Sequence, residues 1–275
     1  MTIIERCKTV TVRAWIDELE MTGHTTFSLE NAASAFPSLE KQVLQNNLMR
    51  LKNEKRIVSV YRRFYVIMPI RYKSRGIIPP TYYLPELMRF LGRPYYFGLL
   101  TAAKVWGASH QMPLVDFATT TYPALNSSKN MNASIHWCYR YKMPVDFLVE
   151  RNDANGTVLY SSPELTAVEL VQYARHCGGL SNVATVLAEL SDSLDFGKLP
   201  TTFFEYCKGT SIQRLGYILD EVLGAKDVAN ALCEQWKANC RVANTCLNVE
   251  SSHDVVTHNR RWHINVNEKL EVDDL

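Results

Sequence analysis

The chain has few of the features that mark secreted, membrane-bound or metal-binding proteins. Its seven cysteines include no Cys-x-x-Cys pair, and the closest group, Cys233, Cys240 and Cys246, does not have the spacing of the usual zinc modules. No apolar run approaches the roughly 18 residues needed to cross a bilayer, and the N-terminal stretch lacks the apolar core of a signal peptide. We therefore expect a cytoplasmic protein with reduced thiols, no membrane contact and no metal site.

Signatures of the common enzyme classes are also missing. The chain contains no Gly-x-x-x-x-Gly-Lys-Ser/Thr, no Gly-x-Gly-x-x-Gly, no Gly-x-Ser-x-Gly and no His-Glu-x-x-His. Glu164 and Glu169 could form a pair of carboxylates. No base, nucleophile or metal ligand lies near them at a spacing that would indicate an active site, so we expect both to be solvated. The sequence predicts a protein that is not an enzyme and uses no cofactor.

Length and composition predict two globular domains. The chain has 275 residues, of which 47% are hydrophobic and 21% charged, as in ordinary globular proteins. Between Pro69 and Pro80 the basic residues end, and Gly76 and Pro79 interrupt regular structure. We expect a first domain over residues 1–75 and a second, larger one over residues 76–275.

Two helices in close succession are predicted in the first domain. Ser28 can cap a short helix that Pro37 ends, and Ser38 can cap a longer helix that runs to about Lys55. Another amphipathic stretch, over residues 8–20, predicts a helix that packs behind these two and completes a three-helix core.

Two β-rich runs follow the helices. Residues 57–60 and 64–67 are rich in β-branched and aromatic side chains, and Arg62 and Arg63 lie between them. Two helices followed by a hairpin with a basic tip is the order of a winged helix-turn-helix DNA-binding domain. The alternative is that the basic helix and hairpin form an ordinary solvated face.

Positive charge is concentrated in this part of the chain. Residues 38–75 hold ten lysines or arginines against Glu40 and Glu54, whereas the whole chain has 30 basic against 28 acidic residues. Such an uneven distribution favours nucleic-acid binding, because lysine and arginine neutralise phosphates while glutamine can bond to base edges. We predict that DNA is contacted by Ser38, Lys41, Gln42, Gln45, Lys52, Arg56, Arg62 and Arg63.

The second domain is predicted to mix helices and strands, which gives an α+β fold for the whole chain. Residues 95–108 are mostly small or apolar and predict a buried helix that ends near Gly107. Several β-rich runs follow between residues 113 and 161. Helical patterns then dominate from Ser162 to about Val242, before a strand predicted over residues 260–266.

Four segments of the second domain resemble, in the same order, segments of the AbiEi-family antitoxins of type IV toxin–antitoxin systems. They are Tyr96-Phe-Gly-Leu-Leu-Thr-Ala-Ala-Lys-Val-Trp-Gly107, Gly156-Thr-Val-Leu-Tyr-Ser-Ser-Pro-Glu-Leu-Thr-Ala-Val-Glu-Leu-Val171, residues 178–190 and residues 213–219. One departure is Leu165, at a position where many members of the family carry arginine. With the predicted winged helix in front, the resemblance covers most of the chain.

The resemblance implies an N-terminal winged helix-turn-helix domain followed by a mixed α/β antitoxin domain. It further implies that the protein represses its own promoter, with double-stranded DNA as a partner. The antitoxin domain would counteract a cognate nucleotidyltransferase toxin, and this need not involve a stable complex with that toxin. Four basic residues that are not obviously in the core are candidates for antitoxicity: Arg140, Lys142, Arg175 and Arg214.

Two other functions remain open at this point. In one, the second domain inhibits the toxin by binding it directly, and the winged helix serves as a scaffold. In the other, the protein is a ligand-responsive transcription factor with the second domain as its sensor, for which a large and partly polar pocket in that domain would be the expected sign.

Overall fold

The chain folds into two compact units in the computed structural model, which describes residues 11–73, 78–108, 114–125, 135–153, 156–251 and 257–272. The first unit comprises Met1–Tyr95, Tyr122–His136 and Asn152–Val158, and the second comprises Tyr96–Thr121, Trp137–Arg151 and Leu159–Leu275. The first unit thus extends beyond the boundary that the sequence suggested after residue 75.

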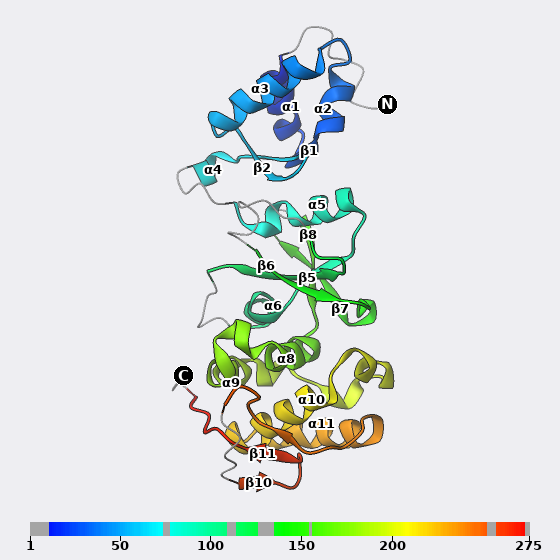
Figure 1. Ribbon diagram of the computed structural model, residues 1–275, viewed down its shortest axis with the longest axis vertical. Helices are drawn as coiled ribbons and strands as arrows, with labels where there is room; N and C mark the ends of the chain where they lie inside the picture. Colours follow the sequence, from blue (N-terminus) through cyan, green and yellow to red (C-terminus); the bar gives the residue numbers. More distant parts are fainter. Residues whose placement is uncertain are drawn as a thin grey trace. The chain divides into compact units, whose positions relative to one another are not determined.

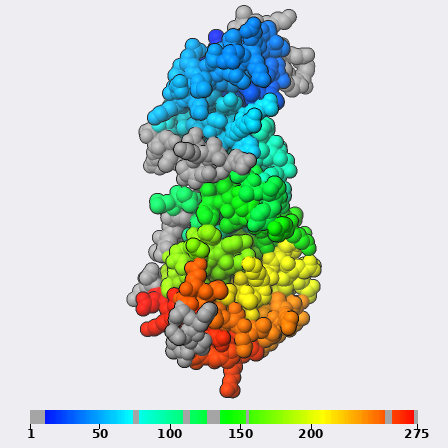
Figure 2. Space-filling model, viewed as in Figure 1, coloured from blue at the N-terminus to red at the C-terminus, as the bar shows by residue number. Residues whose placement is uncertain are grey.

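The first unit begins with three helices and the three strands of a small antiparallel sheet. Its elements are α1 (Val12–Met21), β1 (Thr26–Ser28), α2 (Leu29–Ala35), α3 (Lys41–Asn53), β2 (Ile57–Tyr61) and β3 (Phe64–Ile67) (Figure 1). The strands are ordered β1-β3-β2, with Val58 opposite Val66 in the hairpin. In the space-filling view these residues, coloured blue to light blue, form one continuous body (Figure 2).

The first unit has its own apolar core, built around aromatic side chains. Trp15 of α1 packs edge-on against Phe27 of β1 and Phe36, with ring centroids 5.2 and 5.8 Å apart. Leu48 and Ile57 complete this core from α3 and β2. Apolar surface buried in this way holds the helices on the sheet at about 25 cal/mol per Å² removed from water.

One of the two predicted helix caps is confirmed. The Ser28 hydroxyl accepts from the backbone N–H of Asn31, whose side chain accepts from the backbone N–H of Ser28 in return. The prediction for Ser38 is wrong. Pro37 and Ser38 lie in a turn, α3 starts only at Lys41, and no side chain caps its first turn.

The end of α3 is closed by a backbone motif that normally uses glycine. Lys55 has a φ of +53°, and its N–H donates to the carbonyl of Lys52 at 3.0 Å while the N–H of Arg56 donates to that of Leu51 at 2.9 Å. This pair of bonds is the Schellman motif, in which the left-handed residue is most often glycine because other side chains are strained there.

We expect Lys55→Gly to stabilise the first unit by about 0.5–1 kcal/mol, because glycine adopts a positive φ without strain. Chemical denaturation followed by circular dichroism measures the change. Lys52→Gly is the matched control: it places glycine inside the same helix, where it should destabilise by about 1 kcal/mol. Equal losses in both variants would contradict the strain at Lys55.

The first unit continues past the hairpin with short helical elements. They are α4 (Ile70–Lys73), the 3₁₀ turn η2 (Pro80–Tyr82) and α5 (Leu84–Leu91). Gly92 ends α5 with a φ of +63°. Phe90 of α5 packs on Phe64 of β3 with ring centroids 5.2 Å apart, which ties α5 to the hairpin.

A five-stranded sheet, most of whose residues belong to the second unit, has the strand order β6-β5-β4-β8-β7. The strands are β4 (Tyr95–Phe97), β5 (Asp116–Thr121), β6 (Ile135–Arg140), β7 (Leu148–Asp153) and β8 (Gly156–Ser161). Helix α6 (Leu99–Val105) lies beside the sheet in Figure 1 and contacts β5. The helix predicted over residues 95–108 is therefore wrong in its first turn. Three buried aromatic residues form a strand there instead, which suits their β-propensity.

Helices make up most of the remaining second unit. They are α8 (Pro163–Gln172), α9 (Gly179–Leu190), α10 (Gly209–Tyr217), the π-helical turn η8 (Ile218–Val222) and α11 (Lys226–Asn239), with several 3₁₀ turns between them. Ser162 caps α8, because its hydroxyl accepts from the backbone N–H of Leu165. Helix α8 contacts α6, α9 and α10, so it stands at the centre of the apolar core of this unit.

The chain closes with β9 (Thr245–Cys246), β10 (Thr257–Asn259) and β11 (Ile264–Val266). The strand predicted over residues 260–266 is therefore shorter, because residues 260–263 form a turn. Trp262 in this turn is fully buried, and its indole N–H donates to Asp220 at 2.9 Å. Among the helices of the described ranges, none has the length and apolar character needed to cross a membrane.

Candidate nucleic-acid interface

Helix α3 presents a polar face to solvent. Leu44, Leu48 and Leu51 fix the orientation of the helix by burying the opposite side. The predicted contact residues Lys41, Gln42, Gln45 and Lys52 are all exposed, as is Ser38 in the preceding turn. Leu39 and Val43 are 36% and 41% exposed and add apolar area to this surface. The face thus combines amide groups with positive charge.

The tip of the β2–β3 hairpin carries Arg62 and Arg63. Arg63 has a φ of +64°, its carbonyl accepts from the N–H of Leu29 at 2.8 Å, and its guanidinium pairs with Glu30 at 2.6 Å. Arg63 therefore fixes the hairpin tip against the start of α2. Arg62 is exposed and forms no ion pair with the part of the chain that the structure describes.

Arg56 has a different environment from the other predicted contact residues. It is 8% exposed, and its guanidinium donates to Asp17 at 2.6 Å and to Glu20 at 2.5 Å. Burial acts to lower the pKa of Arg56, but the two carboxylates outweigh it and the pKa is raised. The expected role of Arg56 in DNA contact is corrected here: its side chain joins α3 to α1 and does not reach the surface.

Ion pairs remove several acidic groups from the field around α3. Asp17 and Glu20 are bound by Arg56, and Glu54 is bound by Arg13. Lys41 and Lys52 form no ion pair with any described residue. The exposed charge of the α3 face is consequently positive, and charged side chains of that kind attract phosphate.

Among the antitoxicity candidates, Arg140 belongs to a buried network. Its guanidinium donates to Glu169 at 2.7 Å and to the Tyr96 hydroxyl at 3.0 Å, and the Tyr96 hydroxyl donates to Glu169 at 2.5 Å. The side chains of Arg140 and Glu169 are 11% and 4% exposed. Burial raises the pKa of Glu169, and the adjacent Arg140 opposes that shift. Arg140 is therefore a core residue and not a surface contact.

Glu169 was missed as a structural residue, since it was expected to be solvated. It lies in α8 within an almost unbroken buried stretch from Leu165 to Val171, and this apolar run is the signal that could have revealed it. One of its carboxylate oxygens, Oε2, has no hydrogen-bond partner among the described residues. A Cβ placed at Gly98 would lie 3.0 Å from this oxygen, which explains the glycine after Tyr96 and Phe97.

The other three antitoxicity candidates lie nearer the surface. Lys142 pairs with Glu205 at 3.0 Å. Arg175 and Arg214 line one small hollow of about 140 Å³ together with Glu250. Arg214 is half-buried, because its guanidinium donates to the carbonyl of Cys246 at 2.9 Å and to Thr245 at 3.0 Å. The structure thus brings two of the four together, and only Lys142 and Arg175 extend into solvent.

Comparison with known proteins relates the chain to a protein family and to a solved structure. Residues 96–221 match the model of the AbiEi antitoxin C-terminal domain. The crystal structure of the RV2827C protein from Mycobacterium tuberculosis has a similar fold, with a TM-score of 0.65 and 13% identity over 91% of this chain and 89% of that one. No curated protein matches significantly. The predicted resemblance is confirmed over residues 96–221, which carry an AbiEi antitoxin C-terminal domain, a domain of toxin–antitoxin systems.

Proposed function

We propose that this antitoxin binds the promoter of its own operon through α3 and the β2–β3 hairpin, and thereby represses its own synthesis. The observation that carries this proposal is the exposed face of α3, on which amide and lysine side chains lie together while Asp17, Glu20 and Glu54 are paired with arginines. Glutamine reads base edges in the major groove and lysine contacts phosphates, so the face offers both kinds of contact.

The order α1, β1, α2, α3, β2 and β3 supports a winged helix-turn-helix in which α3 is the recognition helix and the hairpin is the wing. In this proposal residues 1–75 are the DNA-binding domain and residues 76–275 the antitoxin domain. Arg62 is the main wing contact, since Arg63 already bonds to Glu30. The DNA contacts are Ser38, Lys41, Gln42, Gln45, Lys52, Arg62 and, in part, Arg63.

We expect Arg62→Ala to weaken binding to every DNA sequence and to reduce the salt dependence of the affinity by about one unit in the log–log slope, because one phosphate contact is lost. Gln45→Ala should instead reduce the preference for the operator over random DNA, by about 1–3 kcal/mol of discrimination. Fluorescence anisotropy over a salt series measures both.

Arg89→Ala is the matched control, since it removes an exposed arginine of the same unit that pairs with Glu86 and lies outside α3 and the hairpin. An equal change of slope in the Arg89 and Arg62 variants would rule out the hairpin as a DNA contact. Equal losses of Gln45→Ala on operator and random DNA would rule out base reading by that residue.

The second part of the proposal is that residues 76–275 counteract a nucleotidyltransferase toxin. The match to the AbiEi antitoxin domain supports this role. Co-expression of the toxin with the full antitoxin should restore growth, and growth inhibition that persists would count against it. Co-purification of the two proteins then separates inhibition by direct binding from protection without a stable complex.

A further inference from the structure

The small hollow on the second unit that contains Arg175 and Arg214 carries more positive than negative charge. Residues of α8, α9 and α10 and of the segment after β9 form its wall, and its volume is about 140 Å³. The charged side chains in this wall are Arg175, Arg214 and Glu250. Sites that enclose a whole small molecule measure roughly 300–1,000 Å³, so this hollow has room for one group of a ligand.

Arg214 contributes a half-buried cation that has only neutral partners. Its Nε donates to the carbonyl of Cys246 at 2.9 Å and its Nη2 to the hydroxyl of Thr245 at 3.0 Å. No acidic group among the described residues forms an ion pair with it, and burial lowers its pKa. A guanidinium has five N–H groups, so those of Nη1 are left to donate to a ligand.

Two other buried arginines of the chain are neutralised within the protein. Arg56 donates to Asp17 at 2.6 Å, and Arg140 donates to Glu169 at 2.7 Å. A cation that is taken partly out of water is stabilised by a nearby anion, because the solvation it loses is replaced by the opposite charge. Arg214 lacks such a carboxylate in the described part of the chain, so an anion from outside can supply the missing charge.

Arg175 is the more exposed of the two arginines and is only loosely paired. Its side chain is 78% exposed, and its Nη1 lies 3.6 Å from Oε1 of Glu250, which is too long for a hydrogen bond. Ion pairs at such exposure contribute little to stability. Arg175 can therefore exchange Glu250 for a ligand of higher negative charge.

The neutral polar groups of the wall leave donors and not acceptors for a ligand. Asn248 is already used on both sides, since its Oδ1 accepts from the N–H of Glu250 and its Nδ2 donates to Glu268. Glu268 also accepts from Ser251 and does not line the hollow. The amide of Gln172 lines it and can donate to an anion.

We propose that this hollow binds a phosphate group between the guanidinium groups of Arg214 and Arg175. A phosphate monoester carries about −1.5 to −2 charges at pH 7 and three acceptor oxygens, so it can accept from both arginines at once. A carboxylate has one charge and two oxygens and suits this pair of cations less well. None of the described residues that line the hollow is aromatic, so a nucleoside attached to the phosphate remains in solvent. The site does not depend on the proposed DNA contact of α3.

Isothermal titration calorimetry of the full chain in a phosphate-free buffer of low salt tests the proposal. Inorganic phosphate should bind with a Kd below about 1 mM, and acetate at least about tenfold more weakly. Adenosine 5′-monophosphate distinguishes the source of the phosphate: an affinity equal to that of inorganic phosphate supports any accessible phosphate group, and a higher one supports a nucleotide. Absence of phosphate binding, equal binding of acetate, or equal binding of adenosine and its monophosphate would overturn the proposal.

Three variants of the wall locate the site. Arg214→Gln should weaken phosphate binding at least about tenfold, and the more exposed Arg175→Ala at least about threefold, because each removes a charged donor. Glu250→Gln should tighten binding at least about twofold, because it removes the negative charge of the wall. Arg175 and Glu250 are exposed, so their variants test the site even if Arg214→Gln does not fold.

Two lysine variants serve as controls. Lys198 is an exposed cation of the same unit that pairs with Asp195 outside the hollow, and Lys41 is an exposed cation of α3. Lys198→Ala and Lys41→Ala should each change phosphate binding less than about twofold. A loss in either that equals the loss in Arg175→Ala, or weaker binding by Glu250→Gln, would show that phosphate is not bound in this hollow.

Discussion

Replacing Arg140 with methionine is expected to lower the free energy of unfolding of the second unit by about 3–5 kcal/mol. Methionine preserves most of the volume but removes the cation that lies 2.7 Å from Glu169. Glu169 is 4% exposed, so it would lose the cation that stabilises its charged form and keep only the Tyr96 hydroxyl as a partner. Urea denaturation followed by circular dichroism measures the loss.

The pH dependence of the stability of the same variant is a second test of the Arg140–Glu169 pair. Arg140 lowers the pKa of Glu169 against the effect of burial, so its removal raises that pKa further. The folded variant then keeps a proton that the unfolded chain releases, and its stability falls as the pH rises above the ordinary carboxyl range. Wild-type protein should show a weaker decline over the same range.

Two control variants distinguish a buried Arg140–Glu169 ion pair from a surface role of Arg140. Glu169→Gln combined with Arg140→Met removes both charges and should recover most of the stability lost in the single variant. Lys142→Ala, in an exposed residue just beyond the same strand, should leave the denaturation midpoint unchanged. A stable Arg140→Met protein that fails only in antitoxicity would contradict our assignment of Arg140 to the core.

Gly216→Ala is expected to destabilise the second unit by about 3 kcal/mol or more, which is large for one added methyl group. A Cβ at Gly216 would lie 2.0 Å from the ring of Trp262. Trp262 is fully buried, stacks on Trp236 with centroids 5.6 Å apart and donates to Asp220. The ring cannot move aside without losing these contacts, so the added methyl displaces the turn before β11.

Gly209→Ala is the matched control in the same helix. The nearest atom to a Cβ at Gly209 is 3.8 Å away, an ordinary contact, and alanine should be neutral or slightly stabilising there. Trp262→Leu alone should also destabilise, but the double variant with Gly216→Ala should lose less than the sum of the two. Strict additivity in thermal or urea denaturation would show that the two positions do not touch.

Local sequence signals predicted much of the fold of the first unit. Two runs rich in β-branched and aromatic residues predicted the hairpin, and the position of Ser28 before a helical pattern predicted its cap. Such signals act within one turn of helix or one pair of strands, so they can be read without knowing the rest of the chain.

Contacts between residues far apart in the chain could not be predicted in this way. Arg56 was expected to face DNA, but its partner Asp17 lies 39 residues earlier. Glu169 was expected in solvent, but Tyr96 is 73 residues away from it. The strand at Tyr95–Phe97 depends on pairing with β8, which the local pattern of a small, apolar helix does not reveal. In each case tertiary packing decided the outcome.

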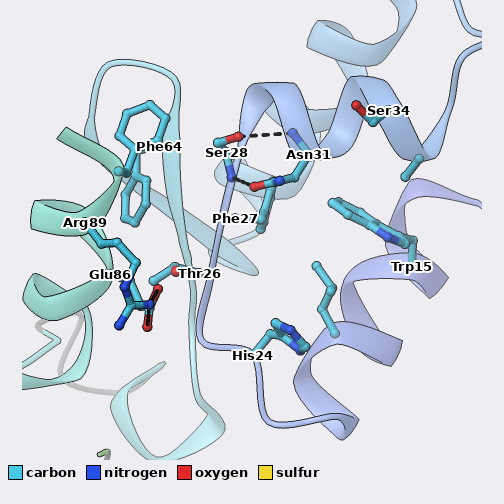
Figure 3. A pocket seen from close by; sticks show the side chains of 13 residues that line it. Trp15, His24, Thr26, Phe27, Ser28, Asn31, Ser34, Phe64, Glu86 and Arg89 are labelled. Carbon is cyan, nitrogen blue, oxygen red and sulfur yellow. Dashed lines mark hydrogen bonds and ion pairs between the residues drawn. The ribbon is translucent and has the colours of Figure 1, made fainter. Parts of the chain in front are cut away.

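A cavity of about 600 Å³ in the first unit, with Trp15, Ser34 and Glu86 among its lining residues, also depends on tertiary structure, because its walls come from α1, β1, α2 and α5 (Figure 3). A pocket was expected, if at all, in the second domain.

The most direct test of DNA binding by the α3 face is fluorescence anisotropy of the full protein with DNA from upstream of its own reading frame. A random duplex runs alongside over the same salt series. We predict tight binding that favours the upstream DNA by about a hundredfold or more and weakens with salt. Equal and weak binding to both duplexes, abolished by moderate salt, would contradict the account and leave the first unit as a scaffold for the antitoxin domain.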